Sequence, residues 1–109
     1  MKLYKLNRFI GGWVVGNFDP SIIKTSAFEF GVKHYIAGQR DVAHLHKQAQ
    51  EITIIVSGVF RFNGRKVKKD DVILLNKGDI SSFECMETGS IACIKTPSVI
   101  GDKHVIEKR

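Results

Sequence analysis

Two histidines and a glutamate in the middle of the chain have the types and the spacing of metal ligands. His44 and His46 are separated by one residue, and Glu51 follows after four more. Side chains alternate between the two faces of a β-strand, so both imidazoles point the same way if this segment is a strand. If residues 47–50 turn the chain back, the carboxylate of Glu51 meets them from the neighbouring strand. Imidazole nitrogens and a carboxylate oxygen suit iron, manganese, nickel or zinc, so we predict a divalent-metal site.

Short runs of β-branched and aromatic residues surround these three residues and predict the strands that position them. The runs are separated by Gly, Asn, Asp and Lys, and no long stretch shows the 3.6-residue period of a helix. We expect strands at 13–15, 27–36, 42–46, 51–56, 59–63, 72–75, 81–86 and 90–95. Short strands at such regular spacing predict an all-β sandwich or barrel.

The pair Asn63-Gly64 gives the strongest turn signal in the sequence. Both residue types tolerate positive φ, and apolar residues flank the pair, so a tight hairpin is expected here. Glycine-containing turns are also expected at 57–58 and 88–89. The second half of the chain is therefore predicted to be a series of antiparallel strands.

Gly38 and Gly58 flank the three candidate ligands and complete a longer pattern. The pattern G-x5-H-x-H-x4-E-x6-G is unbroken from Gly38 to Gly58 and resembles the first motif of the cupins. The resemblance implies a cupin-type jelly-roll β-barrel of antiparallel strands with the metal inside the barrel. We therefore interpret the chain as a small single-domain cupin that binds metal through His44, His46 and Glu51.

A second cupin-like segment, from Asp71 to Glu84, departs from the family pattern. Gly78 keeps its place, Asn76 stands where the family has proline, and Ser81 stands where the family has a fourth ligand, a histidine. The resemblance thus implies a site with three protein ligands. Ionisable residues inside a barrel are costly without a partner, which favours metal binding by the three that remain.

Further pocket residues are expected on the strand before the first motif. Lys33 and Tyr35 share one face of this strand, and we predict that they line a substrate pocket together with Ser81. His34 points to the other face, where a surface role is expected. His44 and His46 are also the candidate catalytic residues.

Three functions are consistent with these residues. The first is a metal-dependent enzyme, of isomerase, lyase or dioxygenase type, acting on a small polar metabolite, with an anionic metabolite among the options. The second is a metal-free cupin that uses His44 or His46 as a general acid-base on a sugar or nucleotide-sugar-like substrate, which Ser81 favours modestly. The third is a non-catalytic cupin that binds a ligand.

The length of 109 residues predicts one domain with two peripheral segments. Residues 1–26 are expected to form N-terminal strands and a turn, 27–98 the barrel core, and 99–109 a polar tail that frays. Asp19-Pro20 predicts a short helical turn that continues to Ile23. By analogy with cupins we expect a homodimer, with the aromatic-containing segment 4–15 contributing to the contact.

Charge and cysteine content limit the partners and the compartment. The net charge of +6 is concentrated at 61–69 and at both ends, but Asp70 and Asp71 follow the basic run directly and no aromatic residues alternate with basic ones, so nucleic acid is not expected. No apolar run approaches the roughly 18 residues of a membrane span. Cys85 and Cys93 have no CxxC spacing and are expected to be free thiols, which favours the cytoplasm.

Overall fold

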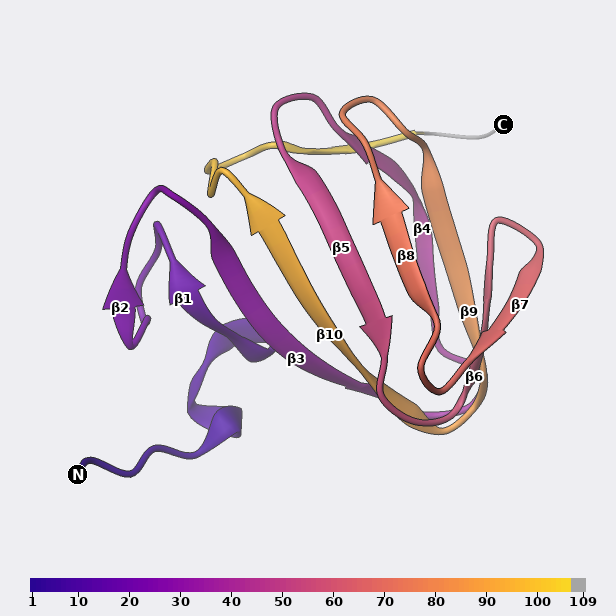
Figure 1. The fold of residues 1–109 in the computed structure, drawn as a ribbon, viewed down its shortest axis with the longest axis horizontal. Coiled ribbons are helices and arrows are strands. Elements are labelled where there is room, and N and C mark those ends of the chain that lie inside the picture. The colour runs from indigo at the N-terminus through magenta and orange to yellow at the C-terminus, as the bar shows by residue number, and fades with distance from the viewer. Residues whose placement is uncertain (107–109) are drawn as a thin grey trace.

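A computed structural model describes residues 1–106; residues 107–109, the end of the predicted polar tail, lie outside the described residues. The described residues form two short 3-10 helices and eleven strands (Figure 1). Their bounds are η1 Leu6–Arg8, η2 Ile10–Gly12, β1 Trp13–Gly16, β2 Ile23–Lys24, β3 Glu29–Tyr35, β4 Arg40–His46, β5 Gln50–Ile55, β6 Val59–Phe62, β7 Arg65–Lys68, β8 Val72–Leu75, β9 Ser81–Glu87, β10 Gly89–Thr96 and β11 Lys103–Val105. None of the helices in this described part is long and apolar enough to cross a membrane.

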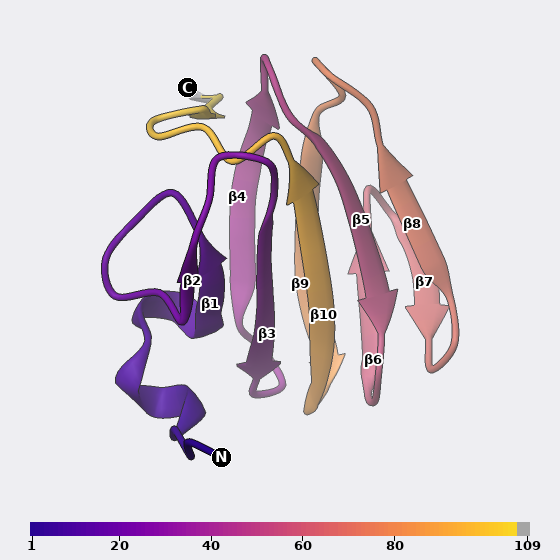
Figure 2. The ribbon, with the colours of Figure 1, turned by 60° about the vertical axis from the view of Figure 1, so that its left-hand side comes forward.

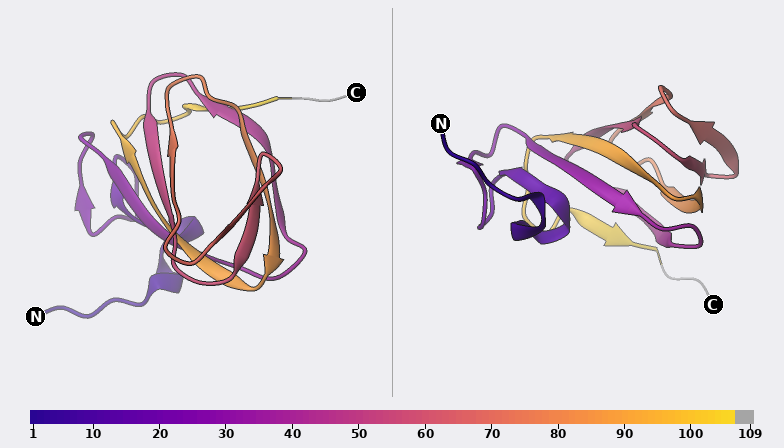
Figure 3. Two further views of the ribbon diagram at one scale, coloured as in Figure 1. Left: turned by 45° about the vertical axis from the view of Figure 1, so that its right-hand side comes forward. Right: turned by 90° about the horizontal axis from the view of Figure 1, so that it is seen from below.

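The strands form two sheets that face each other. One sheet has the order β2-β1-β3-β10-β5-β8, and the other has the order β11-β4-β9-β6-β7. Figure 2 shows the two layers, with the N-terminal segment outside them, and Figure 3 shows the barrel-like outline of the same strands. The predicted all-β jelly-roll fold is confirmed.

All eight predicted strands are present, as β1, β3, β4, β5, β6, β8, β9 and β10. The predicted hairpin is also confirmed: Asn63 and Gly64 have φ angles of 48° and 81°, and Phe62 pairs with Arg65 across the turn. Strand β7, the basic strand that follows this turn, was not among the predicted strands. It lies at the edge of its sheet, where lysine and arginine side chains remain in water.

The predicted helical turn from Asp19 to Ile23 is wrong. Residues 23–24 form β2 instead, which pairs with β1 and makes a parallel contact in a fold expected to be antiparallel. The backbone N–H of Ile22 donates to the carbonyl of Val14 at 2.7 Å. Because β1 satisfies this donor, the segment has no need of hydrogen bonds within a helix.

The predicted fraying of the polar tail is wrong for residues 103–105. Lys103–Val105 forms β11, which pairs antiparallel with the end of β4. Asp102, just before it, is only 5% exposed. The tail is ordered because it supplies the hydrogen-bond partners for an edge that β4 would otherwise leave open.

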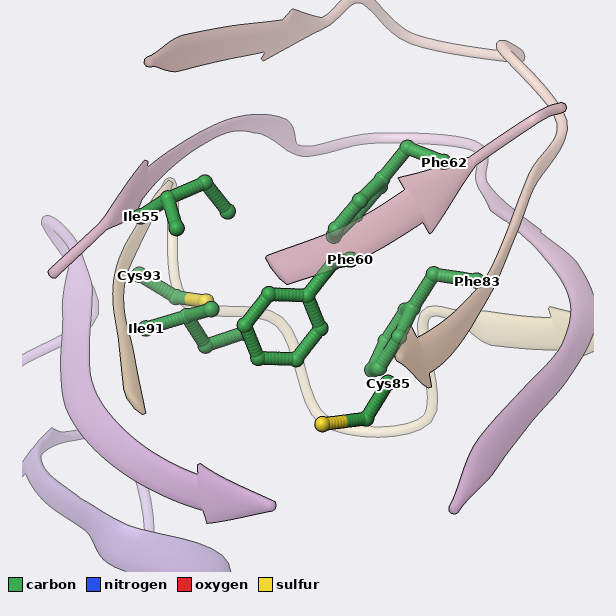
Figure 4. Close-up of a cluster of buried hydrophobic side chains, with 7 residues drawn as sticks. All are labelled: Ile55, Phe60, Phe62, Phe83, Cys85, Ile91 and Cys93. Atoms are coloured by element: carbon green, nitrogen blue, oxygen red, sulfur yellow. The ribbon is translucent and has the colours of Figure 1, made fainter. Parts of the chain in front are cut away.

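The apolar core fills one end of the space between the sheets (Figure 4). Phe60 is completely buried and makes ring contacts with Phe62, Phe83 and Tyr35. Both cysteines are free thiols in this region of the fold. The remaining members of the core are Ile55, Phe62, Phe83, Cys85, Ile91 and Cys93.

Candidate functional site

Strand β4 places the two candidate histidines side by side in the interior. His44 and His46 are 7% and 6% exposed, and their rings meet edge to face with centroids 5.4 Å apart. Residues 47–49 then reverse the chain into β5, which begins one residue before Glu51. His46 Nδ1 lies 3.9 Å from Glu51 Oε1. The structure therefore brings the predicted ligands together at the end of the barrel that carries the β4–β5 connection, uppermost in Figure 1.

Asp102 holds this connection in place from the far end of the chain. Its carboxylate accepts hydrogen bonds from the backbone N–H groups of Lys47, Gln48 and Ala49 at 2.9 to 3.2 Å. Burial alone would raise the pKa of Asp102, but the three backbone hydrogen bonds outweigh it and lower the pKa. Asp102 was not predicted as a site residue, because its partners are more than fifty positions away along the chain.

The β8–β9 loop is tied to the same strand. The backbone N–H of Gly78 donates to the carbonyl of His46 at 2.8 Å, and Gly78 has a φ angle of 81°. A left-handed backbone of this kind favours glycine. This contact gives a physical reason for the one residue that the second cupin-like segment retains.

Both imidazoles are suited to donate an electron pair. His44 Nδ1 donates to the carbonyl of Val42 at 2.8 Å, so in the neutral ring the free electron pair is on Nε2. Among the described residues, His46 Nε2 is buried without a hydrogen-bond partner. Burial lowers the pKa of His46 to about 4, and the nearby Lys95 adds to the effect, so His46 is neutral at pH 7.

Glu51 is oriented by its neighbour on the same face of β5. Thr53, which is completely buried, donates from Oγ1 to Glu51 Oε2 at 2.8 Å. The other carboxylate oxygen, Oε1, faces His46. A hydroxyl that fixes one oxygen and leaves the second available is a common arrangement behind metal-binding carboxylates.

The side chains approach the spacing of a metal site without reaching it. Two ligands that each lie about 2.1 Å from one ion are roughly 3 to 3.5 Å apart. His46 Nδ1 lies 3.9 Å from Glu51 Oε1, slightly beyond this range, and the nitrogen of His46 without a partner is the other one, Nε2. Within residues 1–106, no group of three or more His, Cys, Asp or Glu side chains is close enough to hold a metal ion. The donor types and the buried, unpartnered nitrogen of His46 are nevertheless of the kind that a metal binds.

A cavity of about 110 Å³ adjoins His44 and Glu51. Lys33, Tyr35 and Ser81 also line it. Ser81 is 3% exposed and lies directly opposite His44 in the β4–β9 ladder. The residue at the sequence position of the fourth cupin ligand is therefore buried next to His44. Burial raises the pKa of Tyr35, so its hydroxyl keeps its proton at neutral pH.

Several lining residues were not among the predicted pocket residues. Trp13, which the sequence analysis left out of the site, and Lys95 both line this cavity. The alternation of side chains along a strand could have predicted Lys95 as a pocket residue, because it shares the inward face of β10 with Ile91 and Cys93. His34 is exposed on the outside of β3, where its ring is hydrogen-bonded to Ser90.

His46 faces a second cavity, of about 260 Å³, next to the first. Lys95 and Lys103 line both cavities, so the two are neighbours separated by side chains. A larger cavity, of about 630 Å³, lies between β7 and β8 and is lined by none of the predicted site residues. The predicted metal ligands and pocket residues therefore surround the cavities of about 110 and 260 Å³.

No protein-family model matches the sequence, and no curated protein is significantly similar to it. Solved structures do resemble the fold. An uncharacterized conserved protein with a double-stranded β-helix domain from Klebsiella pneumoniae has a TM-score of 0.72 and 18% identity, with 98% of this chain and 93% of that chain covered.

Two further solved structures show the same resemblance. An RmlC-like cupin from Shewanella frigidimarina has a TM-score of 0.65 and 15% identity over 69% of this chain and 70% of that one. The bacterial pirin YhhW from Escherichia coli, solved in complex with nickel(II), has a TM-score of 0.66 and 16% identity over 80% of this chain and 39% of that one. At these identities the likeness establishes the fold. The chain therefore has the cupin fold, a double-stranded β-helix.

Proposed function

We propose that the protein binds a divalent metal through His44, His46 and Glu51 and acts on a small polar molecule in the adjoining cavity. The observation that carries this proposal is the buried Nε2 of His46, which has no partner among the described residues and belongs to a ring that lies beside the ring of His44 and the carboxylate of Glu51. A buried polar atom without a partner costs about 1–3 kcal/mol, so a ligand for it would repay this cost.

The surrounding residues support metal binding over simple packing. The Val42 carbonyl fixes the ring of His44, and Thr53 fixes the carboxylate of Glu51. Such second contacts usually orient the ligands of a metal and raise its affinity. The nickel(II) in the pirin YhhW shows that a protein of this fold can hold a transition metal.

The reaction we propose is of isomerase, lyase or dioxygenase type. A bound metal would supply a Lewis acid or an oxygen-binding centre. The chain itself would hold the substrate against Tyr35 and Ser81, and the protonated hydroxyl of Tyr35 would donate a hydrogen bond to it. A cavity of about 110 Å³ favours a small substrate.

Elemental analysis of protein purified without a metal-affinity tag tests the proposal. We expect close to one metal ion per chain, after reconstitution with iron, manganese, nickel or zinc if necessary. The double variant His44→Gln/His46→Gln should lose the metal, while His104→Gln, a change to a partly exposed histidine on β11, should keep it. Retention of metal by the double variant would overturn the assignment. No metal in either protein, with activity that survives chelation, would favour the acid-base alternative.

We also propose that the protein forms a homodimer through the outer face of the larger sheet. Two rows of apolar side chains cross β3, β10, β5 and β8 on this face. The rows are Phe30, Ile94, Ile52, Leu74 and Val32, Ala92, Ile54, Val72. Neither row contains a charged residue, so a second copy docked on this face would place no charged side chain of these rows against a like charge.

Light scattering at micromolar concentration tests the dimer. We expect the mass of two chains for the parent and of one chain for Ile54→Lys, because lysine at the centre of the face would bury an unpaired charge. Val42→Lys, a change at an exposed apolar position on the other sheet, should leave the dimer intact. A monomeric parent would exclude this interface. Segment 4–15, which was expected to contribute to the contact, forms η1, η2 and most of β1.

A further inference from the structure

Three lysines converge on the 110 Å³ cavity, and one of them has no acidic partner. Lys95 Nζ lies 3.8 Å from Glu29 Oε2, and Lys103 Nζ lies 3.3 Å from Asp41 Oδ1. Lys33 differs from both, because no carboxylate within residues 1–106 lies within 4.0 Å of its Nζ. Its positive charge is therefore not neutralised by the described part of the chain.

The indole of Trp13 positions this charge at the cavity. Lys33 Nζ lies 4.6 Å from the centre of the Trp13 ring, and Lys95 Nζ lies 4.8 Å from it. Gly31 makes room for the ring, since a Cβ atom there would lie 2.8 Å from Trp13 Cε3. A cation over an indole is attracted to it, but the ring carries no net negative charge and leaves Lys33 able to bind an anion.

Partial burial makes the unpaired charge of Lys33 unfavourable. Burial lowers the pKa of Lys33, and the ammonium of Lys95 lowers it further. A bound anion would offset the desolvation of the ammonium and would form a charge-assisted hydrogen bond. The cavity thus lacks one negative charge next to Lys33.

The lining and size of the cavity indicate which anion fits. Of the three lysines that line it, Lys95 and Lys103 have the carboxylate partners Glu29 and Asp41, so Lys33 offers the one cation without an ionic partner. One water molecule takes up about 30 Å³, so the cavity holds the equivalent of about four waters or one organic acid of a few carbons. No arginine or helix N-terminus lines it, although these are the usual partners of a phosphate group.

We propose that Lys33 anchors the carboxylate of a small organic monoacid, held beside Trp13 with the rest of the molecule toward His44 and Glu51. This inference rests on the proposed function, because it names the substrate class for the same pocket. Lys33 is in this view a substrate-binding residue, and Trp13 is the residue that positions it. The anchoring itself involves only the chain and requires no metal.

Fluorescence of Trp13 tests this proposal directly, because it is the only tryptophan in the chain. The protein is first treated with a chelator, and lactate is then titrated at constant ionic strength beside lactamide, a neutral molecule of nearly the same shape. We expect a saturable change in emission with lactate and at least about tenfold weaker binding of lactamide, as expected for the loss of one charge-assisted contact.

Variants of Lys33 separate binding from packing. Lys33→Met keeps the length and apolar stem of the side chain and should weaken lactate binding by at least about tenfold. Lys33→Arg should restore most of it, and Lys66→Met, a change on the exposed edge strand β7, should titrate like the parent. If Lys33→Met fails to fold, the comparison of Lys33→Arg and the parent with lactate and lactamide still decides the question.

Three results would overturn the proposal: equal responses to lactate and lactamide, unchanged binding by Lys33→Met, or tighter binding of inorganic phosphate than of lactate. Because the titration is done without metal, its result is independent of the elemental analysis. Metal binding without lactate binding would leave the metal site and remove the carboxylate subsite. Lactate binding in a protein that takes up no metal would support the carboxylate subsite and contradict the metal site.

Discussion

The two ends of the barrel differ in chemistry although the same strands build both. Along β5 the inward residues are Glu51, Thr53 and Ile55, and along β9 they are Ser81, Phe83 and Cys85. Each strand thus changes from polar to apolar side chains in steps of two residues. The apolar end packs aromatic rings against each other, whereas the polar end encloses histidines, lysines and two small cavities.

This difference suggests that the apolar end of the barrel stabilises the fold and that the polar end binds ligands. Burial of apolar surface stabilises the fold by roughly 25 cal/mol per Å². Burial of an imidazole or an ammonium without a partner opposes folding. Stability should therefore come mainly from the apolar end, and the polar end should contribute binding. The following substitutions test this division from the largest expected effect to the smallest.

Phe60→Ala should give the largest loss of stability. Phe60 is completely buried and contacts three other rings, so removal of its side chain leaves a cavity in the centre of the apolar end. We expect the free energy of unfolding to fall by about 3–5 kcal/mol in urea titrations. Phe30→Ala changes a residue on the outer face of β3 that is partly exposed. In the monomer it should lower the free energy of unfolding much less than Phe60→Ala does. Equal losses would contradict the importance of the apolar end.

Asp102→Ala should give the largest loss of stability at the polar end. It removes the acceptor of three backbone hydrogen bonds in the turn between β4 and β5. We expect a loss of about 2 kcal/mol in urea, together with weaker metal binding, because the turn positions His46 and Glu51. Asp19→Ala, which breaks an exposed ion pair with Lys24, should change stability by less than about 0.5 kcal/mol. If metal affinity is unchanged in Asp102→Ala, the turn does not position the ligands.

Thr53→Val should affect binding more than stability. The substitution keeps the shape of a completely buried side chain and removes the hydroxyl that holds Glu51. We expect a loss of about 1 kcal/mol in stability and a 10- to 100-fold loss of metal affinity by calorimetry. Thr96→Val, which removes an exposed hydroxyl contact with Ala27, is the matched control. An unchanged affinity in Thr53→Val would remove Thr53 from the site.

The acid sensitivity of Asp102 should give the smallest effect. Its pKa is lower in the folded protein than its ordinary value of 3.8, so the charged form stabilises the fold. This contribution is complete above about pH 4 and is lost as the pH falls through the lower folded pKa. In urea titrations without metal, Asp102→Asn should flatten the decline in stability below pH 4. The same slope in both proteins would show that other groups cause the decline.

The sequence predicted what depends on local pattern. The strand period placed His44 and His46 on one face, and the pair Asn63-Gly64 marked its hairpin. It did not predict β11 or the role of Asp102, because their stabilising partners lie more than fifty residues earlier in the chain. The tail alone is polar and has no local signal for a strand.

The charges of the pocket lysines also depend on contacts between residues that are distant in the sequence. Lys33 was predicted from its parity with Tyr35, but its unpaired charge depends on which carboxylates the fold brings to Lys95 and Lys103. Trp13 is a large aromatic residue of the kind that usually fills a core. Trp13 fits beside the cavity because Gly31 has no side chain, and a Cβ atom there would lie 2.8 Å from Trp13 Cε3.

Anomalous X-ray scattering from crystals loaded with nickel(II) would test the function of the polar end most directly. We expect one strong peak about 2.1 Å from a nitrogen of His44, a nitrogen of His46 and an oxygen of Glu51. In these crystals the metal-bound nitrogen of His46 and the metal-bound oxygen of Glu51 should lie roughly 3 to 3.5 Å apart around the ion. Nickel bound only at surface histidines such as His34 or His104, with the interior side chains unmoved, would contradict a metal site in this fold.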